Sequence, residues 1–181
     1  MTKRIKQIRS IVDTLLEQGK FTEPPIRVQE IAVGQKINVR EEELGEISGL
    51  IFREGSQVII GVNSSHPPKR KRFTIAHELG HFFLHSENPL FVDKVFAVKL
   101  RDHVSSEAIN KDEIEANAFA AELLMPSKFL REDFSKVKSG VLDYENEDIG
   151  DAIKSLADRY DVSTHAMTVR LINLGVIQDI L

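Results

Sequence analysis

Residues 73–85 read FTIAHELGHFFLH and form the most informative stretch of the sequence. His77 and His81 are four residues apart, so on a helix both imidazoles lie on one face with their Cβ atoms about 6 Å apart. Two imidazoles at that separation can bind one metal ion. Glu78 points to the neighbouring sector, where its carboxylate is placed to act as general base towards a water molecule at the ion. The stretch therefore predicts a metal-binding helix over residues 69–85.

A catalytic zinc site normally needs a third protein ligand, and this helix does not supply one. His85 shares the face of His77 and His81 but lies about 12 Å along the helix axis from His77, too far to bind the same ion. The longer metzincin motif, HExxHxxGxxH, is also absent, because Leu84 and Glu87 stand at its glycine and third histidine. We therefore expect the third ligand on a second helix.

The second predicted helix covers residues 112–124, DEIEANAFAAELL, and contains two glutamates that compete for the ligand role. Glu113 shares a helical stripe with small alanines, which allow close approach to another helix. Glu115 lies on a different stripe, with Lys111 and Glu122, that we expect to face solvent. Glu113 is therefore the preferred third ligand, and Glu115 is the alternative.

Asn117 lies one helical turn after Glu113 and has two interpretations. Its side chain can accept the free ring N–H of a ligating histidine and so fix the tautomer of that histidine. It can equally be an ordinary amide in a helix-packing interface. Both interpretations stay open at the level of sequence.

Composition limits the kind of protein that carries this site. The 181 residues include no cysteine, which excludes disulfides, thiolate zinc sites and thiol catalysis, so histidine and carboxylate must hold any metal. No stretch approaches the ~20 apolar residues that cross a bilayer, and residues 1–20 show helical periodicity instead of the apolar run of a signal peptide. We therefore expect a cytoplasmic protein without a membrane partner. The formal net charge of −4 argues against broad nucleic-acid binding.

The rest of the sequence predicts an α+β fold. Amphipathic helices are expected at residues 2–18 and 27–33, each stopped by a glycine. Strands follow at residues 37–39, 47–52 and 57–62, and a hairpin turn joins the last two. We expect a small, mostly antiparallel three-stranded sheet that packs on the HELGH helix.

The last two predicted helices, residues 149–160 and 163–173, are joined by a tight connection and resemble a helix-turn-helix. The second helix offers only Arg170 as a cation, so we expect it to pack within the protein and not to bind DNA. We divide the chain into a metallopeptidase domain at residues 1–135 and a C-terminal helical subdomain at residues 136–181 that packs on it, or treat both as one continuous domain.

The residues described above resemble those of the ImmA/IrrE family of metallo-endopeptidases. Weaker similarity extends over nearly the whole chain. The resemblance implies a zincin-like fold in which His77, His81 and Glu113 are the metal ligands and Glu78 is catalytic. Zinc is the expected ion, and this ligand set also tolerates manganese. Besides residues 73–85, the resemblance rests on Glu113-x-x-Ala116-Asn117-x-Phe119-Ala120-x-x-Leu123-Leu124-Met125-Pro126.

The resemblance also implies a biological role. Members of the family are intracellular endopeptidases that cleave a helix-turn-helix transcriptional repressor, which derepresses stress-response or mobile-element genes. The alternative is a non-catalytic module on the same fold that binds a repressor or DNA. A module of that kind is expected to lose catalytic residues, whereas this chain retains both histidines, Glu78 and Glu113. The enzyme is therefore favoured.

Three further features concern substrate contacts. The strand at residues 57–62 either lies at a sheet edge and holds an extended substrate by strand addition, or is internal. The basic run at residues 69–72 is either a docking patch for an acidic segment of the substrate or a solvated surface. The sequence does not place a group that stabilises the oxyanion. The side chains available for that role are Tyr144, Tyr160, His103, His165 and Arg72.

Overall fold

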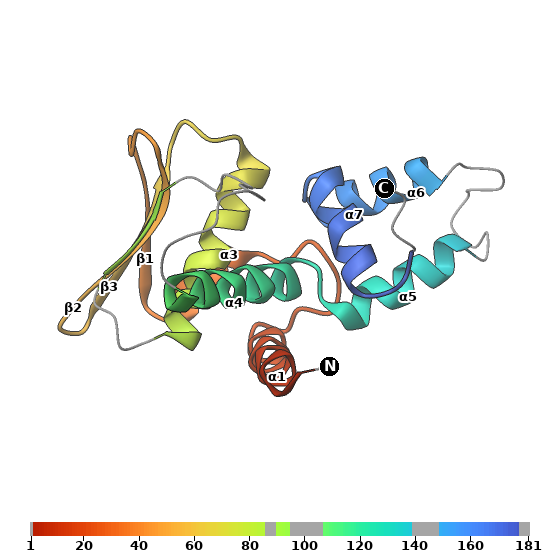
Figure 1. Ribbon diagram of the computed structural model, residues 1–181, viewed down its shortest axis with the longest axis horizontal. Coiled ribbons are helices and arrows are strands. Elements are labelled where there is room, and N and C mark those ends of the chain that lie inside the picture. Colours follow the sequence, from red (N-terminus) through yellow and green to blue (C-terminus); the bar gives the residue numbers. More distant parts are fainter. Residues whose placement is uncertain (1, 86–89, 95–106, 139–148, 178–181) are drawn as a thin grey trace.

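The computed structural model describes residues 2–85, 90–94, 107–138 and 149–177. It has the predicted α+β class, with a sheet at one end, helices α3 and α4 beside it, and helices α5 to α7 at the other end (Figure 1). The elements in chain order are α1 (Lys3–Gln18), α2 (Val28–Gly34), β1 (Ile37–Glu42), β2 (Ile47–Glu54), β3 (Gln57–Asn63), α3 (Pro68–Leu84), β4 (Leu90–Lys94), α4 (Glu107–Leu124), α5 (Ser127–Lys138), α6 (Ile149–Arg159) and α7 (Thr164–Asn173).

The sheet has four strands in the order β1-β3-β2-β4. Strand β2 is antiparallel to both β3 and β4, while β1 is parallel to β3, so the sheet is mostly antiparallel as predicted. The predicted number of three strands is wrong, because β4 adds a fourth. Strand β4 is only five residues long and has no clear alternation of apolar and polar residues, so its pairing with β2 depends on a long-range contact that a local pattern does not reveal.

Strand β3 lies inside the sheet, between β1 and β2. Each neighbour pairs along most of its length, with Ile60 opposite both Val39 and Ile51. Of the two alternatives left open for residues 57–62, the internal strand is therefore confirmed, and the edge strand for substrate addition is wrong. The run of apolar residues in β3 is typical of a strand that is buried on both faces.

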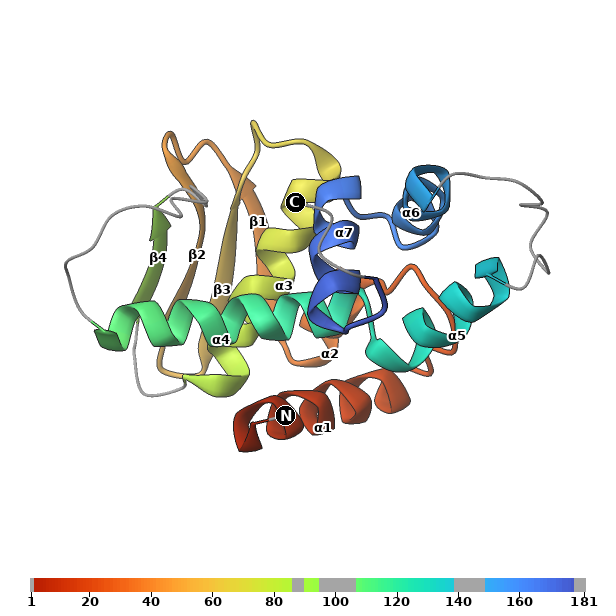
Figure 2. The ribbon, with the colours of Figure 1, turned by 45° about the vertical axis from the view of Figure 1, so that its right-hand side comes forward.

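The core lies between the sheet and the two long helices. Residues 74–81 of α3 are all buried, because β2 and β3 cover one side of this helix and α4 covers another. Helix α1 turns its apolar face inward and lies alongside α4, on the side away from the C-terminal helices α6 and α7 (Figure 2). In the described part of the chain, no helix is both long and apolar enough to cross a membrane.

Two glycines allow the elements around α3 to approach closely. A Cβ atom at Gly80 would lie 2.9 Å from the Cα atom of Ala116, so α3 and α4 contact each other through backbone. A Cβ atom at Gly49 of β2 would lie 2.3 Å from Cγ2 of Thr74 on α3. Any larger residue would force these elements apart. Both contacts lie beside the histidines of α3.

The C-terminal helices are fixed to the rest of the chain by polar contacts. Arg170 of α7 is buried and donates hydrogen bonds to the main-chain oxygen of Met125 at 3.0 and 3.2 Å. The side chain of Arg72 on α3 pairs with Asp161, which connects α6 to α7. Arg170, the cation of the second helix in the predicted helix-turn-helix, therefore takes part in internal packing.

Candidate metal centre

Helices α3 and α4 bring His77, His81 and Glu113 together. The Nε2 atoms of His77 and His81 are 3.0 Å apart. Oε2 of Glu113 lies 3.2 Å from Nε2 of His77, and Oε1 lies 3.2 Å from Nε2 of His81. Both histidines are buried, whereas the Glu113 side chain is 33% exposed. The three side chains therefore face one point that is open on one side.

The spacing of these donor atoms fits a divalent ion. Ligands held at ~2.0–2.1 Å from zinc in a tetrahedron are about 3.3 Å apart. Here the two Nε2 atoms are 3.0 Å apart, and each of them lies 3.2 Å from a carboxylate oxygen of Glu113. Two imidazole nitrogens and one carboxylate also form a donor set that zinc commonly binds, with a fourth position left for water or substrate.

Electrostatics favour the ionisation states that bind a metal. Burial lowers the pKa of His81, and the neighbouring histidines act in the same direction. Burial alone would raise the pKa of Glu113, but the adjacent rings of His77 and His81 outweigh it and hold that pKa well below its ordinary value. At neutral pH the site therefore contains a neutral His81 and an ionised Glu113, which are the forms that ligate metals.

Asn117 is placed to orient His77. Its Oδ1 atom lies 3.2 Å from Nδ1 of His77. If the imidazole carries its proton on Nδ1, this N–H donates to the amide oxygen and the lone pair of Nε2 is left to bind a metal ion. The contact matches the first of the two interpretations of this residue.

Glu78 is fully buried between α3 and β2. A Cβ atom at Gly49 would lie 3.0 Å from its Oε1 atom, so the glycine leaves the space that the carboxylate fills. Glu78 follows His77 directly in α3, so its side chain leaves the helix on the sector next to that of the histidines.

Arg53 is a residue near the site that the sequence did not single out. Its Nη2 atom donates to the main-chain oxygen of His81 at 3.0 Å. Burial lowers the pKa of Arg53, and the negative charge of Glu78 opposes that shift. The sequence predicts a turn at Arg53, after the second strand, but β2 continues to Glu54. Because Ile51 is buried and strand residues alternate, Arg53 shares the face of β2 that meets α3.

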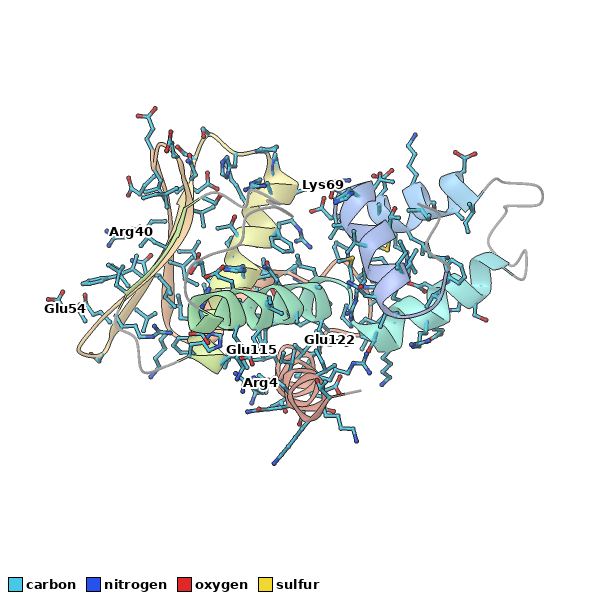
Figure 3. All side chains as sticks on the ribbon, viewed as in Figure 1. Arg4, Arg40, Glu54, Lys69, Glu115 and Glu122 are labelled. Carbon is cyan, nitrogen blue, oxygen red and sulfur yellow. The ribbon has the colours of Figure 1, made fainter. Side chains whose placement is uncertain are left out.

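The stripe of α4 that contains Glu115 and Glu122 was expected to face solvent, and this expectation is wrong. Both glutamates are buried because α1 covers this side of α4 (Figure 3). Arg4 of α1 pairs with Glu115, and Nε of Arg9 lies 3.3 Å from Oε2 of Glu122. Glu115 also contacts Nε2 of His85 at 3.0 Å. Glu115 therefore belongs to a second polar cluster next to the centre and is not grouped with the three donors.

Two of the side chains available as oxyanion donors, Tyr160 and Arg72, are engaged by acidic groups. The Tyr160 hydroxyl donates to Oδ2 of Asp133 at 2.9 Å, and burial raises its pKa. Arg72 pairs with Asp161, while His165 lies exposed on α7. The other two candidates, Tyr144 and His103, lie outside the described residues.

The basic run at residues 69–72 is engaged by other parts of the chain. Each of its four side chains contacts a group on a different element, so these cations join α3 to β1, β2, α6 and the α6–α7 connection. These intramolecular contacts weaken the case for a docking patch. Lys69, Arg70, Lys71 and Arg72 contact Asp158, Ser48, Glu41 and Asp161, respectively.

Comparison with known proteins adds independent information. Residues 33–171 match the family of the IrrE N-terminal-like domain. The metallopeptidase ImmA of Bacillus subtilis is 35% identical over 141 residues, which cover 68% of this chain and 76% of ImmA. The radiation response metalloprotease IrrE of Deinococcus radiodurans is 31% identical over 106 residues, which cover 58% of this chain and 28% of IrrE.

A solved structure has a similar fold. A Mycobacterium tuberculosis transcriptional regulator superimposes with a TM-score of 0.58 at 18% sequence identity. The likeness covers 92% of this chain and 46% of the regulator, so this chain spans about half the length of that protein. At this identity, the likeness concerns the fold alone.

Proposed function

The chain belongs to the IrrE N-terminal-like family and is a metalloprotease, and from this premise we propose that it cleaves internal peptide bonds with a zinc ion held by His77, His81 and Glu113. The family implies a divalent metal. One observation carries our assignment of the ligands, which is the convergence of three donor groups from two helices at 3.0–3.2 Å. Zinc suits this donor set best, and manganese is also tolerated.

The side chains around the centre have separate roles in this proposal. When bound, a divalent ion supplies the Lewis acidity that polarises the scissile carbonyl. The Glu78 carboxylate takes the proton of the attacking water and returns it to the leaving amine. Asn117 orients His77 through the Nδ1 contact, and Arg53 places a positive charge close to Glu78. That charge favours the carboxylate form that a general base requires.

We further propose that the substrate is a helix-turn-helix transcriptional repressor, whose cleavage derepresses stress-response or mobile-element genes. The family membership supports this substrate, and one relative is named a radiation response metalloprotease. A repressor substrate also places the protein in the cytoplasm. Direct DNA binding has less support, because Arg170, the cation of α7, is buried against Glu122 and Met125.

The arrangement of domains is part of the proposal. We assign residues 1–135 to a zincin-like peptidase domain and residues 136–181 to a helical subdomain packed on it. The assignment is supported by the positions of the sheet, α3 and α4, which all lie in the first segment. Contacts from Arg170 and Asp161 join the second segment to α4 and α3.

The decisive experiment compares the wild type with Glu78→Gln. We expect the wild type to contain one zinc per chain and to cleave the helix-turn-helix repressor encoded beside its gene. Glu78→Gln should retain the zinc and lose about 10²–10⁴-fold in the rate of cleavage, because it lacks the general base. Metal analysis and time courses of cleavage, followed by mass spectrometry, measure both. Glu17→Gln, which changes an exposed glutamate of α1, is the control with unchanged activity.

Three outcomes would count against the proposal. A wild type without a divalent metal would remove the metal centre. Equal cleavage by the wild type and Glu78→Gln would remove the assigned base. Relief of repression by Glu78→Gln without any cleavage would support the alternative of a non-catalytic module that binds the repressor.

A further inference from the structure

His85 lies beside the metal centre without being one of its donors. Its Nδ1 atom is 3.2 Å from Nδ1 of His81. For His81 to bind a metal ion through the lone pair of Nε2, its proton must sit on Nδ1. This N–H can then donate only to an unprotonated nitrogen, so Nδ1 of His85 is the acceptor. The geometry thus fixes the direction of the hydrogen bond.

The same reasoning places the proton of His85. Because its Nδ1 accepts, the neutral ring carries its proton on Nε2. That nitrogen lies 3.0 Å from Oε2 of Glu115 and 3.4 Å from Oδ1 of Asp112, so two carboxylates are available to accept the proton's hydrogen bond. The same oxygen of Glu115 pairs with Arg4 of α1. A continuous series of contacts therefore runs from the centre on α3, through α4, to α1.

We propose that His85 is a positioning residue that fixes the tautomer and ring orientation of His81, with Glu115 and Arg4 holding His85 in place. This inference rests on the metal centre proposed above. Metal-ligating histidines commonly donate their second N–H to a carboxylate, a carbonyl or a water. Here His85 takes the place of that acceptor, and the carboxylate of Glu115 contacts His85 instead of the ligating histidine. The anchoring Arg4 precedes residues 33–171, so the support reaches beyond the segment that matches the family.

A second metal ion is the competing interpretation of this cluster. His85, Asp112 and Glu115 each offer a ligand atom, and these atoms lie within 4.8 Å of one another. However, the Arg4 guanidinium contacts the Glu115 oxygen that an ion would need. A guanidinium is permanently charged, so it already supplies the positive charge at this position. We therefore expect one zinc per chain, and two would overturn the inference.

The test uses two amide variants that differ in where they place an acceptor. In His85→Asn the amide oxygen reaches the position of Nδ1 and can accept from His81. In His85→Gln the amide reaches the position of Nε2, where its NH2 group can donate to Glu115, and leaves His81 without that acceptor. We expect the zinc dissociation constant, measured by competition with a chelator, to rise about 10–100-fold in His85→Gln. In His85→Asn it should stay within about threefold of the wild type, because the acceptor is restored.

Nitrogen-detected NMR of the imidazoles gives a readout that a general loss of stability would not move. In the zinc-bound wild type, His81 should carry its proton on Nδ1 in a hydrogen bond, and His85 should carry its proton on Nε2. The Nδ1–H resonance of His81 should keep its hydrogen-bonded shift in His85→Asn and lose it in His85→Gln. Thermal unfolding of the metal-free variants checks that both fold, and His85→Leu replaces the glutamine variant if it does not.

The outcomes separate this inference from the proposed function. Equal zinc affinity in the wild type and His85→Gln, or equally weak binding by the two amide variants, would overturn the role of His85. A proton on Nδ1 of His85 in the zinc-bound wild type would overturn it as well. A wild type that binds no divalent metal would instead contradict the proposed metal centre, and the position of the His85 proton in the metal-free protein would still test its contact with Glu115.

Discussion

Helix α4 carries two buried or half-buried acidic clusters that differ in their partners. In its first half, Glu113 contacts the imidazoles of His77 and His81. Near its end, Glu122 contacts the guanidinium of Arg170 at 2.5 Å. The two glutamates are nine residues apart, which is about 14 Å along a helix. One helix therefore presents two carboxylates in different chemical settings.

Both carboxylate oxygens of Glu122 contact hydrogen-bond donors. Its Oε2 atom contacts Arg170 and Arg9, while its Oε1 atom accepts from the main-chain N–H and the hydroxyl of Ser127 at 2.9 and 2.7 Å. Burial raises the pKa of Glu122, and the charge of Arg170 together with the Ser127 hydrogen bonds reverses that effect and lowers it. These contacts join α1, α4, α5 and α7, so the cluster stabilises the fold.

The difference between the clusters lies in the charge of the partner. A guanidinium remains protonated at all accessible pH values, so the charge of Glu122 is balanced within the protein. An imidazole is mostly neutral at pH 7, and burial lowers the pKa of His81 further, so the charge of Glu113 is not balanced in the same way. A carboxylate among neutral imidazoles is suited to bind a cation, whereas a carboxylate among arginines is suited to hold helices together.

The largest expected effect on stability comes from removing the Glu122 carboxylate. Glu122→Ala should lower the free energy of unfolding by about 3–5 kcal/mol, because it leaves Arg170 buried without its carboxylate. Urea unfolding in metal-free buffer measures this loss. Glu113→Ala on the same helix is the matched control, and we expect it to cost about 1 kcal/mol or less, because this side chain is partly exposed. Similar losses of stability in both variants would contradict the distinction between the Glu113 and Glu122 clusters.

Adding zinc should separate the two variants in the opposite way, because the ion depends on Glu113 and not on Glu122. At a zinc concentration about 100 times the dissociation constant, the wild type should gain about 2.7 kcal/mol of stability, because the ion binds the folded state. Glu122→Ala should keep this gain, whereas Glu113→Ala should lose most of it. Unfolding with and without zinc at a fixed protein concentration measures the three values. An equal gain in Glu113→Ala would show that zinc binds elsewhere.

A smaller effect is expected where α3 and α4 approach each other. Gly80→Ala should destabilise the metal-free protein by about 1–3 kcal/mol, because the new methyl group meets the backbone of Ala116. It should also weaken zinc binding, since α4 carries Glu113 away from the histidines as the helices separate. The control is Gly34→Ala in α2, where a Cβ atom meets no other atom within 4 Å. If Gly80→Ala matches this control in stability and zinc affinity, the close approach is not needed.

The part of the site that could be predicted from sequence depends on helical periodicity. The spacing of His77 and His81 places them on one face of any helix, and the stripe of small residues around Glu113 indicated close packing against another helix. These statements need only local geometry. They account for the three donor groups that the structure brings together.

Other features depend on contacts between distant segments. The burial of Glu115 and Glu122 results from the packing of α1, more than 100 residues away in the chain, against that side of α4. The role of Arg53 depends on the extension of β2 beyond the expected turn. The fourth strand and the internal position of β3 depend likewise on pairing between segments that are not adjacent.

The sequence by itself determined which residues share a face: His77 with His81 on one helix, and Glu113 with the small alanines on another. Only the tertiary structure decided which faces are covered, and by what. The physical reason is that the backbone geometry of a helix sets side-chain directions locally, whereas burial depends on which element packs on that face. The charged stripe of α4 has the composition of a solvent-exposed surface, and it becomes an interior one because the arginines of α1 balance its charges.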